Sequence, residues 1–248
     1  MPIHLHPTAP LAERVLLPGD PGRALALAQS LLSEPRMFNH NRGLWGYTGT
    51  AGDGDLLTIQ SSGMGGPSAA IVITELAELG ARRLVRVGTS GALDPSLVLG
   101  DLLVPTDALA WDGTSRSLGA TDRVTPDPSV LRTLRATGKL APVVMASVDL
   151  FYGAQEQSFF ERGAQALDME CATLFTLAEN LGLSVAAVLI VSDTLRPERR
   201  RISPDALREA ELAAGAIAAE ALAKETSHEA GSGAVLAHSR EPVGENGS

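Results

Sequence analysis

The chain has 248 residues, of which 44% are hydrophobic, and its formal net charge at pH 7 is -9. This length and apolar content are enough for one domain with a sizeable core, and the negative charge argues against the basic face that nucleic-acid binding requires. A single cysteine, Cys171, excludes an internal disulfide, and no apolar run has the length of a membrane span. We therefore expect a cytoplasmic protein without a nucleic-acid or membrane partner.

Short apolar runs that are typical of strands alternate along the chain with amphipathic runs that are typical of helices. The predicted strands cover residues 14–17, 44–50, 56–61, 83–88, 101–109, 143–147 and 185–191. The predicted helices cover residues 21–32, 68–79, 129–136, 169–181 and 204–224. This alternation predicts an α/β fold, a single domain with a mixed or mostly parallel central β-sheet flanked by helices.

The C-terminal residues differ in composition from the rest of the chain. From about residue 225 onward, Gly, Ser, Glu and His dominate and apolar periodicity is lost. Such a segment cannot bury enough apolar surface to offset the entropy of ordering it. We therefore expect one domain over residues 1–224 and a disordered tail over 225–248.

Residues 61–68, with the sequence Ser-Ser-Gly-Met-Gly-Gly-Pro-Ser, connect a predicted strand to a predicted helix. The glycines allow the backbone to approach a ligand closely, and Pro67 and Ser68 suit the first turn of a helix. The run has neither the Lys-Ser/Thr pair of a P-loop nor the third glycine of a dinucleotide-binding turn. By itself it indicates either a small-molecule site or an ordinary tight turn.

Residues 61–76 as a whole resemble the signature of the nucleoside phosphorylase I family, which includes purine nucleoside, uridine and methylthioadenosine phosphorylases. Further runs resemble that family's motifs and follow its order along the chain. These runs are residues 16–24, 41–43, 84–92, 149–152, 168–175 and 191–193. The resemblance spans residues 4 to 195 and implies the nucleoside phosphorylase fold.

The resemblance implies a phosphate site made by Gly19, Arg23, Arg42, Arg86 and Thr89. Arginines together with backbone donors neutralise and orient a phosphate dianion. Arg86 lies within an apolar strand, where a charge is unfavourable unless it is paired or bound to a ligand. The alternatives are structural: a buried ion pair for Arg86, and solvated surface positions for Arg23 and Arg42.

The resemblance also implies a set of nucleoside-binding residues. These are His4, Met64, Phe151, Asp168, Met169, Glu170 and Asp193. We expect Glu170 to accept both ribose hydroxyls and to favour the positive charge that develops on the sugar during the reaction. Phe151 is expected to stack on the base. Asp168, where relatives often carry Glu, has helix capping as its alternative role, and both methionines have core packing.

Asp193 follows the last apolar strand, at the position where purine-specific relatives place the aspartate that faces N7 of the base. An aspartic acid there can protonate N7 as a general acid and so help the base to leave. Its alternative role is to cap the turn at Thr194. In some relatives an arginine assists this aspartate, but no one of Arg196, Arg199, Arg200, Arg201 and Arg208 aligns with it. The expected catalytic residues are therefore Asp193, Glu170 and Arg86.

Together these motifs predict a purine nucleoside phosphorylase of nucleoside salvage, a pentosyltransferase with inorganic phosphate as co-substrate and no metal or organic cofactor. Two alternatives within the family are a uridine phosphorylase and a methylthioadenosine phosphorylase. Gln155 matches a uracil-reading glutamine of the uridine enzymes, but Gln157 replaces their arginine. Residues 168–175 are close to those of hexameric methylthioadenosine enzymes. A nucleosidase would not need the arginines, and a nicotinamide-dependent oxidoreductase would need a dinucleotide fingerprint.

The resemblance implies a homo-oligomer, a hexamer built as a trimer of dimers. In that assembly His4 and Arg42 of one subunit complete the site of its neighbour. A terminal histidine on the surface is the alternative for His4, and His6 lies only two residues away.

Overall fold

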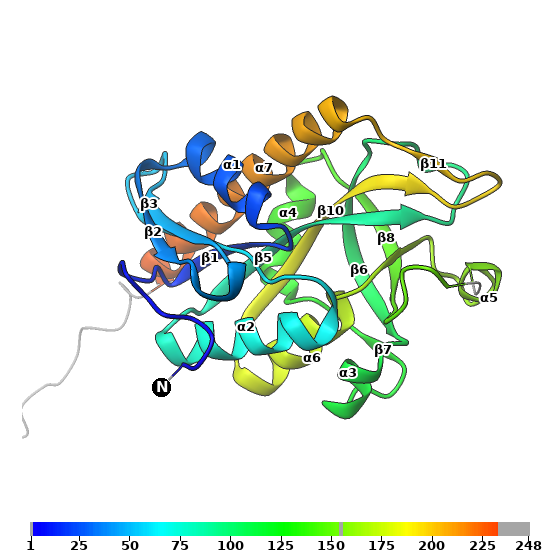
Figure 1. The fold of residues 1–248 in the computed structure, drawn as a ribbon, viewed down its shortest axis with the longest axis horizontal. Coiled ribbons are helices and arrows are strands. Elements are labelled where there is room, and N and C mark those ends of the chain that lie inside the picture. Colours follow the sequence, from blue (N-terminus) through cyan, green and yellow to red (C-terminus); the bar gives the residue numbers. More distant parts are fainter. Residues whose placement is uncertain (1, 154–155, 233–248) are drawn as a thin grey trace, which may run out of the picture.

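The computed structural model describes residues 2–153 and 156–232 (Figure 1). Its strands are β1 (Arg14–Pro18), β2 (Ser33–Asn39), β3 (Gly46–Thr50), β4 (Leu56–Gln60), β5 (Arg83–Ala92), β6 (Leu102–Ala110), β7 (Arg123–Val124), β8 (Ala141–Ser147), β9 (Ala166–Asp168), β10 (Ser184–Thr194) and β11 (Arg200–Arg201). Its helices are α1 (Pro21–Leu31), α2 (Gly65–Leu79), α3 (Gly113–Ser117), α4 (Pro128–Ala136), α5 (Glu156–Glu161), α6 (Cys171–Leu181) and α7 (Pro204–Ser232). A single 3-10 turn within the described part of the chain, η1, covers Asn41–Gly43.

The strands form one mixed sheet in the order β11-β10-β6-β8-β9-β5-β1-β4-β3-β2, with β7 beside β6. Because β10 also pairs with β5, the strands β5, β10, β6, β8 and β9 close into a ring. Strands β4, β1, β5 and β10 are mutually parallel in that order. Their carboxyl ends therefore meet at one edge, which is where sheets of this class bind ligands.

Helices cover both faces of the sheet (Figure 1). Helices α2 and α6 pack on one face, and α1, α4 and α7 pack on the other. Strand β10 shows why the sequence specifies this sandwich. Its odd-numbered residues from 185 to 191 join the first core and its even-numbered residues from 186 to 190 join the second, as expected of a strand buried on both sides. The predicted α/β domain with a mixed central sheet is confirmed.

Each predicted strand and helix is present, but several ends differ. Strand β5 continues to Ala92 and β10 to Thr194, past their apolar runs, because the two strands remain paired there. Helix α6 begins at Cys171 instead of 169, since the Asp168 carboxylate accepts the backbone N–H of Cys171 and fixes the helix start. Helix α2 begins at Gly65 instead of 68, which leaves Pro67 within its first turn.

The predicted tail overlaps the end of the last helix. Helix α7 runs to Ser232, so residues 225–232 are helical where the sequence predicts disorder. Residues 233–248 lie outside the described residues.

No helix among the described residues combines the length and the apolar character that crossing a membrane requires.

Candidate active site

A cavity of about 910 Å³ opens at the carboxyl ends of β5, β9 and β10. The turns that follow β1 and β4 also line it. It contains most of the site residues expected from the sequence. These are Gly19, Arg23, Met64, Arg86, Thr89, Phe151, Asp168, Met169, Glu170 and Asp193. Residues from six separate segments of the sequence therefore meet in one cavity.

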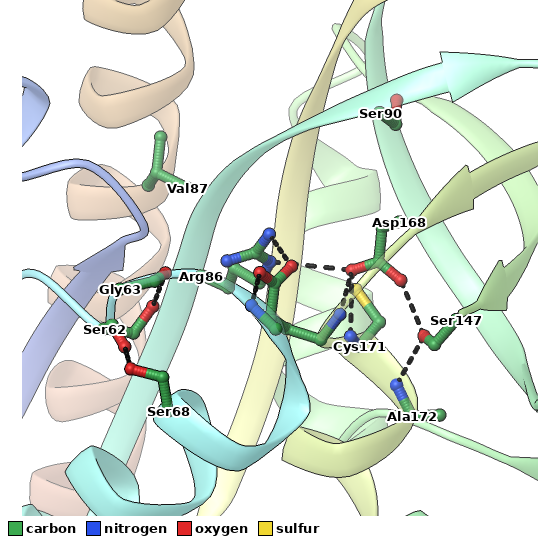
Figure 2. A network of polar contacts seen from close by, with 12 residues as sticks. Ser62, Gly63, Ser68, Arg86, Val87, Ser90, Ser147, Asp168, Cys171 and Ala172 are labelled. Carbon is green, nitrogen blue, oxygen red and sulfur yellow. Dashed lines mark hydrogen bonds and ion pairs between the residues drawn. The ribbon is translucent and has the colours of Figure 1, made fainter. Parts of the chain in front are cut away.

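Arg86 lies at the centre of the polar network shown in Figure 2. Its NH2 group forms an ion pair with Oε2 of Glu170, and its Nε lies 3.7 Å from Oδ2 of Asp168. The side chain is only 5% exposed, yet Nε and NH1 have no hydrogen-bond partner among the described residues. Buried donors are normally satisfied, so Arg86, which lines the cavity, keeps hydrogen-bonding capacity that the described residues do not use.

Two carboxylates keep Arg86 charged inside the protein. Burial alone would lower the pKa of Arg86, but the charges of Glu170 and Asp168 outweigh it and hold that pKa above its ordinary value. For Glu170, burial raises the pKa, Arg86 lowers it and Asp168 raises it again, with a net rise. The ion pair of NH2 with Glu170 supports a structural role for Arg86, and the unpartnered NH1 supports a role in ligand binding.

Glu170 connects two sequence motifs that are far apart in the chain. It occupies the N-cap position of α6 without capping the helix through its own side chain. Instead, its Oε1 accepts the backbone N–H of Gly65 at 2.7 Å. Gly65 has a φ of +80°, a left-handed conformation that favours glycine. The glycine-rich turn predicted as a ligand site therefore lies against the acidic residue predicted to bind the sugar.

Arg23 approaches the same cavity from α1. Its Nε donates to Oε1 of Glu211 at 2.7 Å and its NH1 donates to the Val87 carbonyl at 3.2 Å. The residue is buried, which contradicts the alternative of a solvated surface charge. Gly19 precedes α1, and a Cβ built there would lie 3.9 Å from NH1 of Arg86. The turn after β1 therefore borders the free face of Arg86.

Asp193 lies inside β10 and not beyond its end, because the strand is longer than predicted. A register shift falls between Val191 and Asp193, and the Ser192 hydroxyl donates to Oδ2 of Asp193 at 2.9 Å. Asp193 is buried and lines the cavity. A β-bulge of this kind re-aims a side chain, here at the edge of a site.

The aromatic wall of the cavity includes Trp111 and Tyr152, which sequence analysis did not identify as site residues. Phe151 is half exposed and packs edge-on against Tyr152 at a ring-centroid distance of 5.0 Å. The Arg199 guanidinium lies 5.3 Å from the Phe151 ring centroid, and Arg199 lines the cavity with Trp111. Among the downstream arginines considered above, Arg196 instead lies over the Phe160 ring.

His4 and Arg42 lie outside the cavity of their own chain. Nδ1 of His4 is 2.7 Å from Oε1 of Glu75 on α2, and Arg42 is exposed in η1 with a φ of +56°. Of the two glutamines weighed for uracil recognition, Gln155 lies outside the described residues. Gln157 donates to Glu161 within α5 and does not line the cavity.

The sequence and the fold both match known proteins. The model of the phosphorylase superfamily matches residues 13–226. The DeoD-type purine nucleoside phosphorylase of Geobacillus kaustophilus is 36% identical over 198 residues, covering 75% of this chain and 83% of that protein. The corresponding protein of Caldanaerobacter subterraneus is 33% identical over 196 residues, covering 75% and 84%.

Among solved structures, the uridine phosphorylase of Vibrio fischeri ES114 superposes with a TM-score of 0.77 at 27% identity, covering 86% of this chain and 92% of that one. The relatives thus differ in the base that their names specify, while the sequence and fold matches agree on the family. The chain therefore belongs to the phosphorylase superfamily, and it is a pentosyltransferase of the nucleoside phosphorylase group.

Proposed function

We propose that the protein cleaves purine nucleosides with inorganic phosphate and releases the free base and ribose 1-phosphate or deoxyribose 1-phosphate. The observation that carries this proposal is buried Arg86, which lines the same cavity as Glu170 and Asp193 and whose NH1 has no partner among the described residues. Phosphorolysis of a glycosidic bond needs three groups: a hydrogen-bond donor to the phosphate anion, a carboxylate that binds the sugar, and a proton donor to the leaving base.

The phosphate would bind between the turn after β1 and the carboxyl end of β5. Arg86, with its NH1 unpartnered, lines the cavity together with Arg23, Gly19 and Thr89, and NH1 lies beside Gly19. A phosphate oxygen attacks the anomeric carbon, the bond from that carbon to the base nitrogen breaks, and its electron pair remains on the base. Arg86 both neutralises the attacking dianion and holds it in line.

The sugar would bind at Glu170. Its two oxygens contact Arg86 and the Gly65 N–H, and these contacts fix the carboxylate beside the phosphate position. A carboxylate so placed accepts the ribose hydroxyls and stabilises the positive charge that develops at the anomeric carbon. Met64 and Met169, which also line the cavity, supply apolar contacts to the sugar and base.

The base would lie between Phe151 and Asp193. Asp193 is proposed to protonate N7 of a purine, so that the base departs as a neutral molecule. The Ser192 hydroxyl holds Oδ2 of Asp193 at 2.9 Å, which orients the other carboxyl oxygen. The named relatives favour a purine, and the uridine phosphorylase neighbour makes uridine the second candidate.

The subunit alone is a poor site for a dianion, which supports a shared site in an oligomer. Carboxylates outnumber arginines along the described lining of the cavity, and Arg23 and Arg86 are already paired with Glu211 and Glu170. A further arginine from outside would reduce this excess of negative charge. Arg42, exposed on its own chain, is proposed to play this role with His4 across the interface of a homohexamer, a trimer of dimers.

A single assay tests the activity. Product formation from inosine, adenosine, uridine and methylthioadenosine is measured with and without phosphate, after treatment with a chelator. We expect turnover of a purine nucleoside only with phosphate, and a loss of about 3 kcal/mol or more in transition-state stabilisation for Arg86→Ala. Equal turnover in phosphate-free buffer would indicate a nucleosidase, and turnover of uridine alone would overturn the purine assignment.

In the same assay, the chelator tests the expectation that no metal takes part, and turnover with nucleoside and phosphate as the only additions tests the expectation that no organic cofactor is needed. Among the described residues, no three His, Cys, Asp or Glu side chains gather as a metal site would require. A free buried thiol at Cys171 suits the reducing conditions of the cytoplasm, where we propose that the enzyme acts. Loss of activity on chelation would contradict the expectation that no metal takes part, and fractionation of cells tests the proposed location.

A further inference from the structure

Two buried polar residues, Ser147 and Asp168, form hydrogen bonds with each other and with the first backbone N–H groups of α6. Ser147 ends β8 and Asp168 ends β9, and the two face each other in the parallel register of these strands. The Ser147 hydroxyl donates to Oδ1 of Asp168 at 2.6 Å. Ser147 and the side chain of Asp168 are both fully buried, so the Asp168 carboxylate is closed to solvent.

This pair also caps helix α6, as Figure 2 shows. Oδ2 of Asp168 accepts the backbone N–H groups of Glu170 at 3.1 Å and Cys171 at 2.9 Å. The Ser147 hydroxyl oxygen accepts the N–H of Ala172 at 2.9 Å. The first N–H groups of a helix have no partner within it, so these contacts determine where α6 begins.

The residue at the N-cap position of this helix is Glu170, which we propose binds the sugar. Its backbone is held by Asp168, and its carboxylate reaches Arg86 and Gly65. The same Oδ2 atom of Asp168 lies 3.7 Å from Nε of Arg86. The Asp168 carboxylate therefore has two roles. It fixes the start of the helix next to Glu170, and it faces the Arg86 guanidinium with which Glu170 is paired.

We propose that Ser147 and Asp168 act as one positioning unit, which sets Glu170 and Arg86 in place without contacting the nucleoside. For Asp168 this replaces the direct nucleoside contact expected from the family resemblance. The proposal rests on the proposed function, because it assigns Glu170 to the sugar and Arg86 to the phosphate. Displacements of about 1 Å in such groups cost up to about a hundredfold in rate.

The test compares Ser147→Ala with a matched control, Ser115→Ala. The Ser115 hydroxyl also donates to a buried aspartate, Oδ1 of Asp112 at 2.5 Å, but neither residue lines the cavity. Both variants should lose thermal stability to a similar extent. Only Ser147→Ala should lose kcat, by about tenfold to a hundredfold, with a smaller change in the nucleoside KM.

A second variant, Asp168→Asn, tests the other member of the pair, and its kinetics alone remain informative if Ser147→Ala folds poorly. Asp168→Asn preserves the side-chain shape but removes the charge that faces Arg86. If the two residues act as a unit, Asp168→Asn lowers kcat as well, and adding Ser147→Ala to it causes little further loss. Independent losses that multiply in the double variant would contradict a single unit.

The wild-type enzyme is assayed first, with and without phosphate, so that failure of the proposed function is seen separately. Given a phosphorolytic wild type, unchanged kinetics of folded Ser147→Ala would overturn the positioning role. An equal loss of kcat in Ser115→Ala would also overturn it, because the effect would then be one of general stability. If Asp168→Asn alone loses kcat/KM, and does so through a higher nucleoside KM, Asp168 contacts the substrate directly and the positioning role is wrong.

Discussion

Gly88 makes room for the arginine on which the proposed chemistry depends. A Cβ at this position would lie 2.8 Å from the central carbon of the Arg86 guanidinium and 2.7 Å from Cδ2 of Leu189. Both neighbours are buried and packed. The guanidinium of Arg86 can therefore lie over residue 88, toward the carboxyl end of β5, and reach Glu170 because residue 88 has no side chain.

Gly88→Ala is predicted to displace the Arg86 guanidinium. Overpacking at a buried site costs about 1–3 kcal/mol of stability, and the misplaced guanidinium should raise the KM for phosphate. Gly52→Ala is the matched control, because nothing lies within 4 Å of a Cβ built there. Steady-state kinetics at varied phosphate and thermal unfolding of both variants provide the measurement. An unchanged phosphate KM in Gly88→Ala would show that Arg86 does not need this space.

Asp193→Asn is predicted to lower catalysis on all purine nucleosides, and more for 6-amino than for 6-oxo bases. Asparagine cannot give a full proton to N7, and its NH2 group suits O6 better than a 6-amino group. The change in the ratio of kcat/KM for adenosine to that for inosine should amount to about 1–3 kcal/mol. Asp20→Asn, also at the cavity, should leave that ratio unaltered. No change with Asp193→Asn would remove Asp193 from base recognition.

At the scale of elements, helix α2 holds the N-terminal segment through one carboxylate. Glu75 accepts the backbone N–H groups of Ile3, His4 and Leu5 and contacts Nδ1 of His4. Burial would raise the pKa of Glu75, but the hydrogen bonds of His4 and the backbone donors outweigh it and lower that pKa to about 2. His4, proposed to serve a neighbouring site, is thus attached to α2 by an ionised Glu75.

The stability contributed by Glu75 is predicted to vanish in acid. Its folded-state pKa lies below the ordinary value of 4.5, so the contribution is complete above pH 4.5 and is lost as the pH falls toward 2. Glu75→Gln should therefore destabilise the protein by about 2 kcal/mol at pH 6 and by less at pH 3. Denaturant unfolding at both values measures this, with exposed Glu179→Gln as the control. If the difference in unfolding free energy between wild type and Glu75→Gln is the same at both pH values, the contact does not depend on an ionised Glu75.

The elements that could be predicted from the sequence are those whose own side chains specify them. Strand β10 has a continuous apolar run from 185 to 191, and helix α4 has Asp127 as its N-cap and Pro128 as its first residue, so local sequence predicts both. Strand β2 is mostly exposed and exists because β3 pairs with it, which no local pattern indicates. Strand β9 has three residues, Ala166–Asp168, too few for any periodicity to be seen.

The same distinction applies to the site. The motifs indicated which residues take part, but not how they contact each other. Glu170 lies 84 residues from Arg86 and 105 from Gly65 in sequence, so their contacts depend on the order of the strands. From the sequence, Ser147 is only the end of an apolar run, and its polar side chain at that position is the one available signal for its role in capping α6.

At the scale of the whole molecule, the negative charge of the chain and of its cavity supports the proposal that another subunit contributes positive charge to the site. The chain has a net charge of -9, and its described cavity lining is richer in carboxylates than in arginines. A phosphate dianion would enter such a site poorly unless another subunit contributed positive charge. Arg42 and His4 both lie outside the cavity of their own chain, where a second copy could receive them.

A subunit-mixing experiment tests this shared site directly. Arg42→Ala and Glu170→Ala are each predicted to be nearly inactive alone, because every site lacks one of the two residues. After random exchange in equal amounts, about a quarter of the sites would join an intact Glu170 to a neighbour's intact Arg42, so about a quarter of wild-type activity should return. Mixing Arg86→Ala with Glu170→Ala is the control, since both residues line the cavity of one subunit and exchange cannot reunite them. If native mass spectrometry demonstrates exchange and the Arg42→Ala mixture recovers no more activity than the control mixture, each subunit must contain its whole site.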